Sequence, residues 1–72
     1  MAKLPRLSGK ELIRILEHHG YIQVRTRGSH VRLYPPKDSS LKKVTVPLHN
    51  ELKPGTLASI MSDADLTTED LK

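Results

Sequence analysis

One short segment places a histidine among arginines, a combination that suits chemistry on a phosphodiester. Within residues 25–32, His30 lies close in sequence to Arg25, Arg27 and Arg32. Cleavage of RNA without a metal requires a group that moves a proton near neutral pH, and fixed positive charge where the phosphate becomes more negative. Histidine meets the first requirement and arginine the second. The segment therefore indicates a general acid/base at His30, although a lone strand histidine is more often an ordinary surface residue.

The other histidines do not complete a metal site in the sequence. His18 and His19 are adjacent on a predicted helix, where neighbouring side chains diverge, and His49 lies in a predicted loop. The glycines form no phosphate-binding motif, and no serine stands in a G-x-S-x-G context. We therefore expect no metal and no organic cofactor. His18 and His19 are interpreted as structural, whereas His49 is left open between bridging its loop and a substrate-side role.

The composition is that of one small domain whose positive charge favours a polyanionic partner. The chain has 72 residues, no cysteine and a formal net charge of +4. Residues 1–53 carry 11 Lys/Arg against 4 Asp/Glu, whereas residues 54–72 carry one Lys and 4 acids. This asymmetry favours a nucleic-acid partner, with a basic face that serves only solubility as the alternative. No apolar run is long enough for a membrane span or a signal peptide, so we predict a single cytoplasmic domain over residues 1–72.

Helix signals stand at both ends of the sequence. Ser8 and Glu11 form a capping-box pattern that predicts a helix over about residues 9–19, ended by a glycine. A second apolar stripe predicts a helix over about residues 55–63. Thr67 is placed to cap a short third helix, with acidic residues at its favourable N-terminal end.

Between the helices the apolar period changes to two, which predicts strands. Residues 21–34 are expected to form a hairpin with a tight turn centred on Arg27-Gly28. In that register every apolar residue faces an apolar partner, and His30 lies beside Arg25. The expected apolar pairs are Val24 with Val31, and Ile22 with Leu33.

A third strand at 43–46, ended by Pro47, completes the order α-β-β-β-α after a turn-rich loop at 35–40. The predicted class is α+β, with both helices on the one apolar face of a three-stranded antiparallel sheet. The apolar face is expected to carry Ile22, Val24, Val31, Leu33, Val44 and Val46. The open face is expected to carry Tyr21, Gln23, Arg25, His30, Arg32, Tyr34, Lys43 and Thr45. Because the chain has only two tyrosines, we interpret them as a cross-strand pair rather than a base-stacking platform.

Several of these motifs resemble the HicA toxin family, small mRNA interferases of toxin–antitoxin pairs. The resemblance covers nearly the whole chain. It rests on Ser8-Gly9-Lys10-Glu11-Leu12, His19-Gly20-Tyr21, Arg25-Thr26-Arg27-Gly28-Ser29-His30, Val44-Thr45-Val46-Pro47-Leu48-His49, Leu52-Lys53-Pro54-Gly55-Thr56-Leu57 and Ile60-Met61. It implies a double-stranded-RNA-binding-domain-like fold, cleavage of mRNA by the toxin of a type II system, and neutralisation by a HicB-type antitoxin. By the same resemblance the catalytic histidine corresponds to His30, and Gly28 and Ser29 shape its turn.

The leading hypothesis is a metal-independent endoribonuclease with His30 as general acid/base. The residues expected to hold the RNA phosphates are Arg25, Arg27, Gly28, Ser29, Arg32 and Lys43. A non-catalytic RNA-binding module of the same fold is the alternative, and a protein-interaction domain with a basic face is a third possibility. The sequence does not rank His49, Ser29 or Tyr34 as a second proton-transfer group.

Overall fold

The computed structural model describes residues 4–71. The elements follow one another as α1 (Gly9–His18), β1 (Ile22–Arg27), β2 (His30–Tyr34), β3 (Val44–Pro47), α2 (Pro54–Ala64) and a final 3-10 turn, η1 (Thr68–Leu71). The order α-β-β-β-α and the α+β class are thus confirmed, and this is the arrangement expected of a double-stranded-RNA-binding-domain-like fold.

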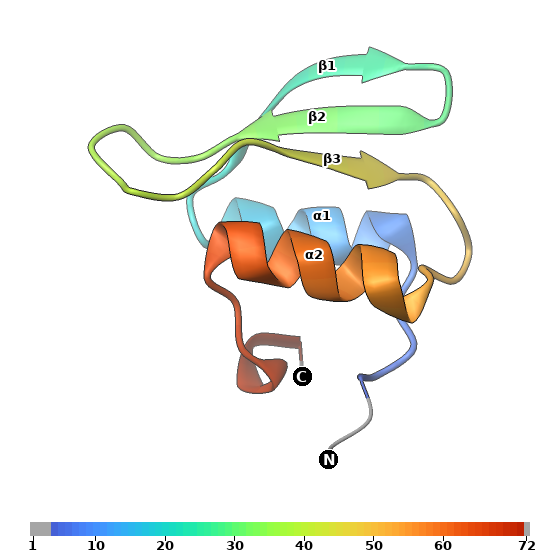
Figure 1. Ribbon diagram of the computed structural model, residues 1–72. Helices are drawn as coiled ribbons and strands as arrows, with labels where there is room; N and C mark the ends of the chain where they lie inside the picture. The colour runs from blue at the N-terminus through green and yellow to red at the C-terminus, as the bar shows by residue number, and fades with distance from the viewer. Residues whose placement is uncertain (1–3, 72) are drawn as a thin grey trace.

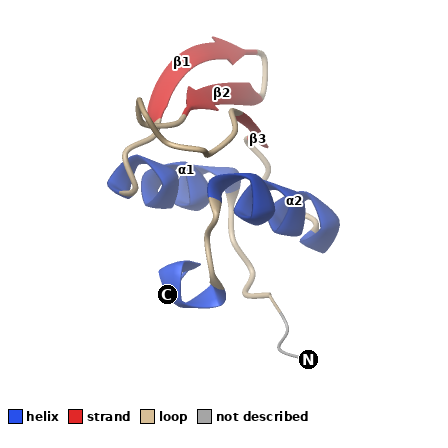
Figure 2. Cartoon of the chain, turned by 60° about the vertical axis from the view of Figure 1, so that its left-hand side comes forward, coloured by secondary structure: helices blue, strands red, loops and turns tan. Residues whose placement is uncertain are grey.

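The molecule has two layers, a sheet and a pair of helices. The sheet is antiparallel with the strand order β1-β2-β3, and both helices lie on one side of it (Figure 1). In the turned view β1 forms the rim of the sheet farthest from the helices (Figure 2). Most of the buried hydrophobic side chains come from the facing surfaces of the two layers: Leu12, Ile13, Leu16, Val31, Leu33, Val44, Val46, Leu57, Ile60, Met61 and Ala64.

The first helix begins as its sequence predicts. The Ser8 hydroxyl accepts a hydrogen bond from the Glu11 backbone N–H at 3.1 Å, and the Glu11 carboxylate accepts one from the Ser8 N–H at 2.9 Å. This reciprocal pair satisfies two donors that a helix start leaves unpaired. The helix ends at His18 with His19 as its C-cap, and Gly20 follows with φ of 95°. That backbone angle is why a glycine stands there.

The hairpin turn lies one residue later than the sequence analysis expected. Its central residues are Gly28 and Ser29, so Arg27, rather than Arg25, pairs with His30. Gly28 has φ of 59°, and Ser29 is outside the positive-φ region. A positive φ confined to the first central residue is typical of a type II′ hairpin turn, which requires glycine in that place. A turn centred on Arg27-Gly28 would have put the glycine second.

The expected apolar face of β1 is wrong because of a β-bulge between Gln23 and Arg25. The extra residue reverses the alternation, so Ile22 pairs with Tyr34, and the side chain of Gln23 donates a hydrogen bond to Glu17 of α1 at 3.2 Å. All of β1 is exposed, including Ile22 at 64% and Val24 at 49%. The helices cover β2 and β3 but leave the rim strand outside the core (Figure 2).

Tyr21 is also placed differently from the prediction. It precedes β1, is buried with 3% of its surface exposed, and does not pair with Tyr34. Its phenol donates a hydrogen bond to the backbone carbonyl of Lys42 at 2.7 Å, which ties the start of the hairpin to the approach to β3. Burial, with a smaller contribution from the Asp63 carboxylate, raises the pKa of Tyr21. The two tyrosines therefore have separate environments, one in the core and one on the sheet.

Candidate active site

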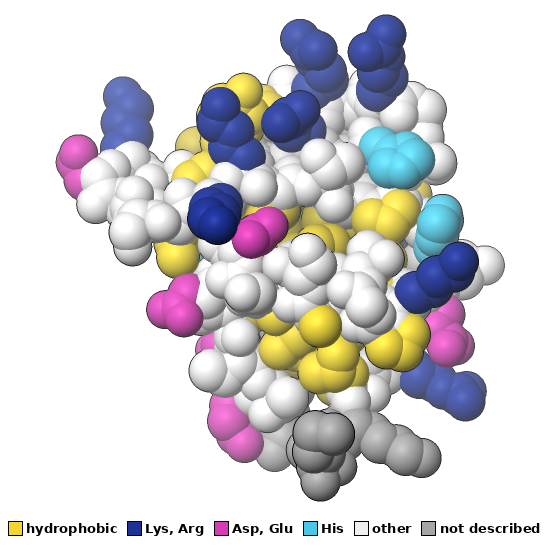
Figure 3. Space-filling view, in the orientation of Figure 1, with side chains coloured by type: hydrophobic (Ala, Val, Ile, Leu, Met, Phe, Trp, Pro, Cys, Tyr) yellow, Lys and Arg dark blue, Asp and Glu magenta, His cyan; other side chains and the backbone are white. Residues whose placement is uncertain are grey.

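A shallow pocket on the open face of the sheet gathers four of the predicted site residues. Its volume is about 160 Å³ and its lining is Arg25, Arg27, His30, Arg32 and Thr45. Lys and Arg side chains spread over the sheet end of the molecule, and histidine side chains lie at the margin near the hairpin turn (Figure 3). The pocket therefore combines a proton-transfer group with three guanidinium groups on one surface.

His30 is held at the first position of β2, directly after the turn. Across the sheet it pairs with Arg27 on one side and with Pro47 on the other. Side chains of directly opposite residues project from the same face of a sheet, so a cross-strand guanidinium flanks the imidazole. His30 is exposed, whereas Val31, the next residue, is buried. The alternation of β2 thus presents the imidazole to solvent and holds its backbone in the sheet.

Two residues after His30 along β2, a second row of paired residues crosses all three strands. Arg25 pairs with Arg32, and Arg32 pairs with Thr45. Two opposed guanidinium groups repel each other in the absence of an anion, so this row is a place where a phosphate would lower the electrostatic energy. Thr45 was not among the residues predicted for the site. The signal that could have found it was its position on the open face of the predicted third strand.

Lys43 lies apart from this pocket. Its ammonium nitrogen stands 4.7 Å from the centre of the Tyr34 ring, a cation–π contact. It lines a separate groove of about 400 Å³ between β3 and α2, together with Thr45 and residues of the helix. Three of the predicted phosphate-holding residues therefore do not line the pocket: Gly28 and Ser29, which form the turn directly before His30, and Lys43, which lies apart from it.

The Gly28-Ser29 turn is fastened to the segment that follows β3. The Leu48 backbone N–H donates a hydrogen bond to the carbonyl of Ser29 at 2.6 Å. The next residue, His49, accepts a hydrogen bond from the Gly9 N–H at 2.9 Å through its own backbone carbonyl. These bonds bring the hairpin turn, the exit of β3 and the start of α1 to one end of the molecule (Figure 1). His30 stands at this end.

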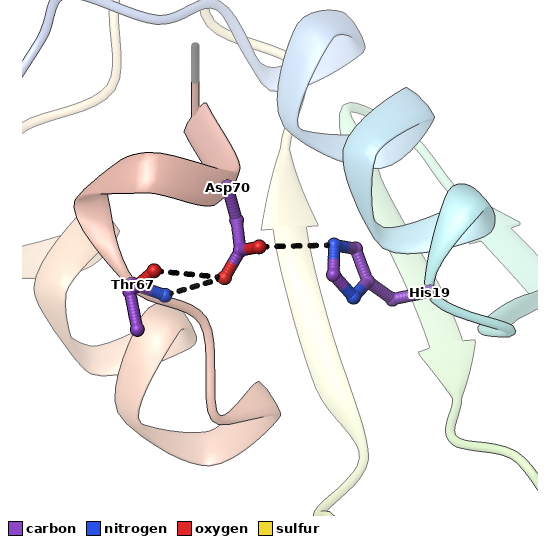
Figure 4. Close-up of polar contacts among 3 residues, drawn as sticks. All are labelled: His19, Thr67 and Asp70. Carbon is purple, nitrogen blue, oxygen red and sulfur yellow. Dashed lines mark hydrogen bonds and ion pairs between the residues drawn. The ribbon is translucent and has the colours of Figure 1, made fainter.

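His18 and His19 lie at the C-terminal end of α1, outside the pocket. His18 is exposed, and the imidazole of His19 approaches the Asp70 carboxylate at 3.6 Å (Figure 4). The backbone N–H and the hydroxyl of Thr67 donate to the same carboxylate at 2.8 and 3.1 Å. The Thr67 backbone hydrogen bond is the main cause that lowers the pKa of Asp70. His19 thus helps to hold η1 against α1, which agrees with its structural interpretation.

Residues 4–71 contain no group of three or more His, Asp or Glu side chains arranged to hold a metal ion. Within the same residues, no helix has the length and apolar character needed to cross a bilayer.

The fold and this surface together define a small α+β protein whose open sheet face presents a histidine among cationic side chains. Residues 9–66 match the family described as HicA toxin of bacterial toxin–antitoxin, and the chain belongs to this family. Membership implies a toxin of a toxin–antitoxin system with an antitoxin partner, in a family whose toxins are generally ribonucleases. A comparison with curated proteins gave no match.

Proposed function

We propose that this toxin is an endoribonuclease that cleaves mRNA in the cytoplasm, with His30 as a general acid/base. The observation that carries the proposal is the pocket in which His30 and three arginines share one exposed surface. Arg25, Arg27 and Arg32 would bind the scissile phosphate and its neighbours, and the backbone of the Gly28-Ser29 turn would border the reacting nucleotide.

The chemistry that these residues could perform is transphosphorylation. The 2′-oxygen of the ribose loses its proton and attacks the adjacent phosphorus, and the bond from phosphorus to the 5′-oxygen breaks. A histidine can take the first proton or supply the one that the leaving oxygen needs. Negative charge grows on the phosphoryl oxygens during the attack, and guanidinium groups fixed beside them stabilise that charge. The expected products are a 2′,3′-cyclic phosphate and a 5′-hydroxyl end, formed without a metal or an organic cofactor.

The direct test is incubation of the purified protein with a long single-stranded RNA in EDTA, followed by mapping of the new 5′ ends. His30→Ala should abolish cleavage while RNA is still retained, because the exposed imidazole contributes little to the core. His18→Ala is the matched control, since it removes another exposed histidine at the opposite end of α1. Thermal melts of all three proteins establish that each is folded.

Two outcomes would contradict the proposal in different ways. Cleavage that survives in a folded His30→Ala variant would refute the site. Salt-sensitive retention of RNA by the unaltered protein, without any new ends, would favour the non-catalytic RNA-binding module, because phosphate contacts alone release counterions.

We further propose that a HicB-type antitoxin covers this surface. Three large exposed hydrophobic side chains support it: Ile22, Val24 and Tyr34, the last with 39% of its surface exposed. Ile22 and Tyr34 are cross-strand partners, and Val24 occupies the bulge beside the arginine pocket. A group of apolar side chains next to a charged site is typical of a surface that a protein partner buries.

Matched lysine substitutions test the antitoxin contact. Val24→Lys places a charge within the proposed contact, whereas Ala58→Lys places the same charge on an exposed position of α2, in the layer behind the sheet. Only Val24→Lys should weaken binding of the antitoxin in a titration calorimeter. Equal affinities of the two variants would show that the partner binds elsewhere.

A further inference from the structure

We propose that His49 is the second proton-transfer group of the reaction and works with His30 as an acid–base pair. This inference rests on the proposed ribonuclease function and assigns a catalytic role to a histidine whose place in the sequence left its role open. The observations behind it are the pairing of His30 with Pro47 and the backbone hydrogen bond between Leu48 and Ser29, next to that pair.

Backbone pairing brings the segment that carries His49 next to His30. His30 pairs with Pro47, and the Leu48 N–H bonds to the Ser29 carbonyl, so the ladder extends one residue past β3. His49 follows directly in the chain, beside the Gly28-Ser29 turn to which Leu48 is bonded. His49 is thus two residues beyond Pro47, the cross-strand partner of His30. Residues so related lie about 7–8 Å apart in a regular sheet, a spacing at which two imidazoles could flank one phosphodiester.

The backbone of His49 is fixed on both sides, while its side chain is exposed. Its carbonyl accepts the Gly9 N–H bond, and the preceding residue bonds to Ser29. Between the two histidines, Pro47 is buried even though it pairs with exposed His30. The space-filling view shows histidine side chains gathered at this margin of the molecule (Figure 3). The imidazole of His49 is therefore presented from a rigid segment without being needed by the core.

Two histidines can carry out both proton transfers that the reaction needs. One neutral imidazole accepts the proton of the 2′-hydroxyl as the new bond from oxygen to phosphorus forms. The other, as imidazolium, donates a proton to the 5′-oxygen as its bond to phosphorus breaks. Proton transfer of this kind contributes typically 10²–10⁴-fold to a rate. The three arginines carry no proton that they can exchange near neutral pH, so they cannot take the second part.

The first experiment measures cleavage of the same RNA by His49→Ala, His49→Asn and the control His18→Ala. Both His49 variants should lose at least about 100-fold in cleavage rate and keep their RNA affinity, whereas His18→Ala should cut normally. The asparagine variant keeps a polar side chain that can hydrogen-bond but cannot exchange a proton, so it separates catalysis from packing. Melting curves should be nearly unchanged, because the backbone bonds of residue 49 remain.

The second experiment identifies a true acid–base pair. An oligoribonucleotide carrying sulfur in place of the 5′-bridging oxygen at the mapped cleavage site has a leaving group that departs without a proton. It should restore cleavage to only one of the two variants His30→Ala and His49→Ala, namely the one that lacks the acid. Restoration of both variants or of neither would overturn the pairing.

The two levels of the proposal fail in distinguishable ways. If the unaltered protein cleaves RNA and His49→Ala cleaves it equally well, the role of His49 is refuted and the ribonuclease function stands. If the unaltered protein binds RNA without cutting it, the ribonuclease function is refuted, and the acid–base pair with it.

Discussion

Gly9 is the first residue of α1. For its substitution by alanine, helix propensity and tertiary structure predict opposite changes in the stability of the protein. Helix propensity alone would favour Gly9→Ala by up to about 1 kcal/mol. In the fold, however, an added methyl group would collide with the carbonyl oxygen of Pro47 and lie 3.1 Å from the Cα of Leu48. Both obstacles are backbone atoms, which cannot rotate out of the way. We therefore expect the substitution to destabilise the protein.

The size of the effect follows from the contacts that must move. Forcing an extra methyl into a packed site costs about 1–3 kcal/mol. Displacement of the segment after β3 would also strain the hydrogen bond from the Gly9 N–H to the His49 carbonyl, worth about 1 kcal/mol. After subtraction of the propensity gain, the net loss is about 1–3 kcal/mol. Each kcal/mol lowers the Tm of a domain this small by about 4–8 °C.

Gly55, near the start of α2, is the matched control. Apart from its chain neighbours and the backbone of its own helix, no atom lies within 4 Å of the position that its added methyl would occupy. Gly55→Ala should therefore stabilise the protein by about 0.5–1 kcal/mol through helix propensity. Urea unfolding followed by circular dichroism gives both free energies. A Gly9→Ala variant as stable as the unaltered protein, or one that changes in the same direction as Gly55→Ala, would refute the argument from packing.

Three further perturbations test other parts of the fold. Tyr21→Phe should lose about 1 kcal/mol in urea unfolding, because it removes the hydrogen bond to the Lys42 carbonyl while keeping the buried ring; an unchanged midpoint would contradict that bond. Gly28→Ala should cost about 1–2 kcal/mol, since φ is 59° there, and normal stability would argue against the turn. The pKa of Asp70 is lowered from its ordinary value of 3.8, chiefly by the hydrogen bond from the Thr67 N–H. The Asp70 carboxylate therefore stabilises the folded protein fully above about pH 3.8, and this stabilisation is lost as the pH falls further and the carboxylate is protonated. Asp70→Asn should flatten the acid limb of a plot of Tm against pH, and an identical acid limb would count against this carboxylate.

The candidate site was recognisable in the sequence because its key residues are close neighbours in the chain. Arg25, Arg27, His30 and Arg32 fall within eight consecutive residues, and a hairpin with a two-residue turn between the second and the third would bring them to one face. The roles of distant residues were not recognisable in this way. Thr45 joins the pocket because β3 pairs with β2.

The local features of the fold were determined by the sequence itself. The capping box at Ser8 and Glu11, the glycine stop after α1, the change of apolar period and the order α-β-β-β-α are all confirmed. Each depends on interactions between residues a few positions apart, such as a side chain that satisfies the N–H group of its own helix turn. These interactions can be assessed without knowing where the rest of the chain lies.

Tertiary structure decided the register, the exposure of β1 and the surroundings of each tyrosine. An apolar residue predicts burial only if another layer covers it, and the two helices do not reach Ile22 and Val24 at the rim. The bulge beside Gln23 moves the side chains of the residues before it to the opposite face of the sheet. The strand was therefore predicted correctly, but the face on which Ile22 lies was not. The segment that leads to His49 is joined to the hairpin turn by the pairing of His30 with Pro47 and by the Leu48–Ser29 hydrogen bond, long-range contacts that no spacing in the sequence encodes.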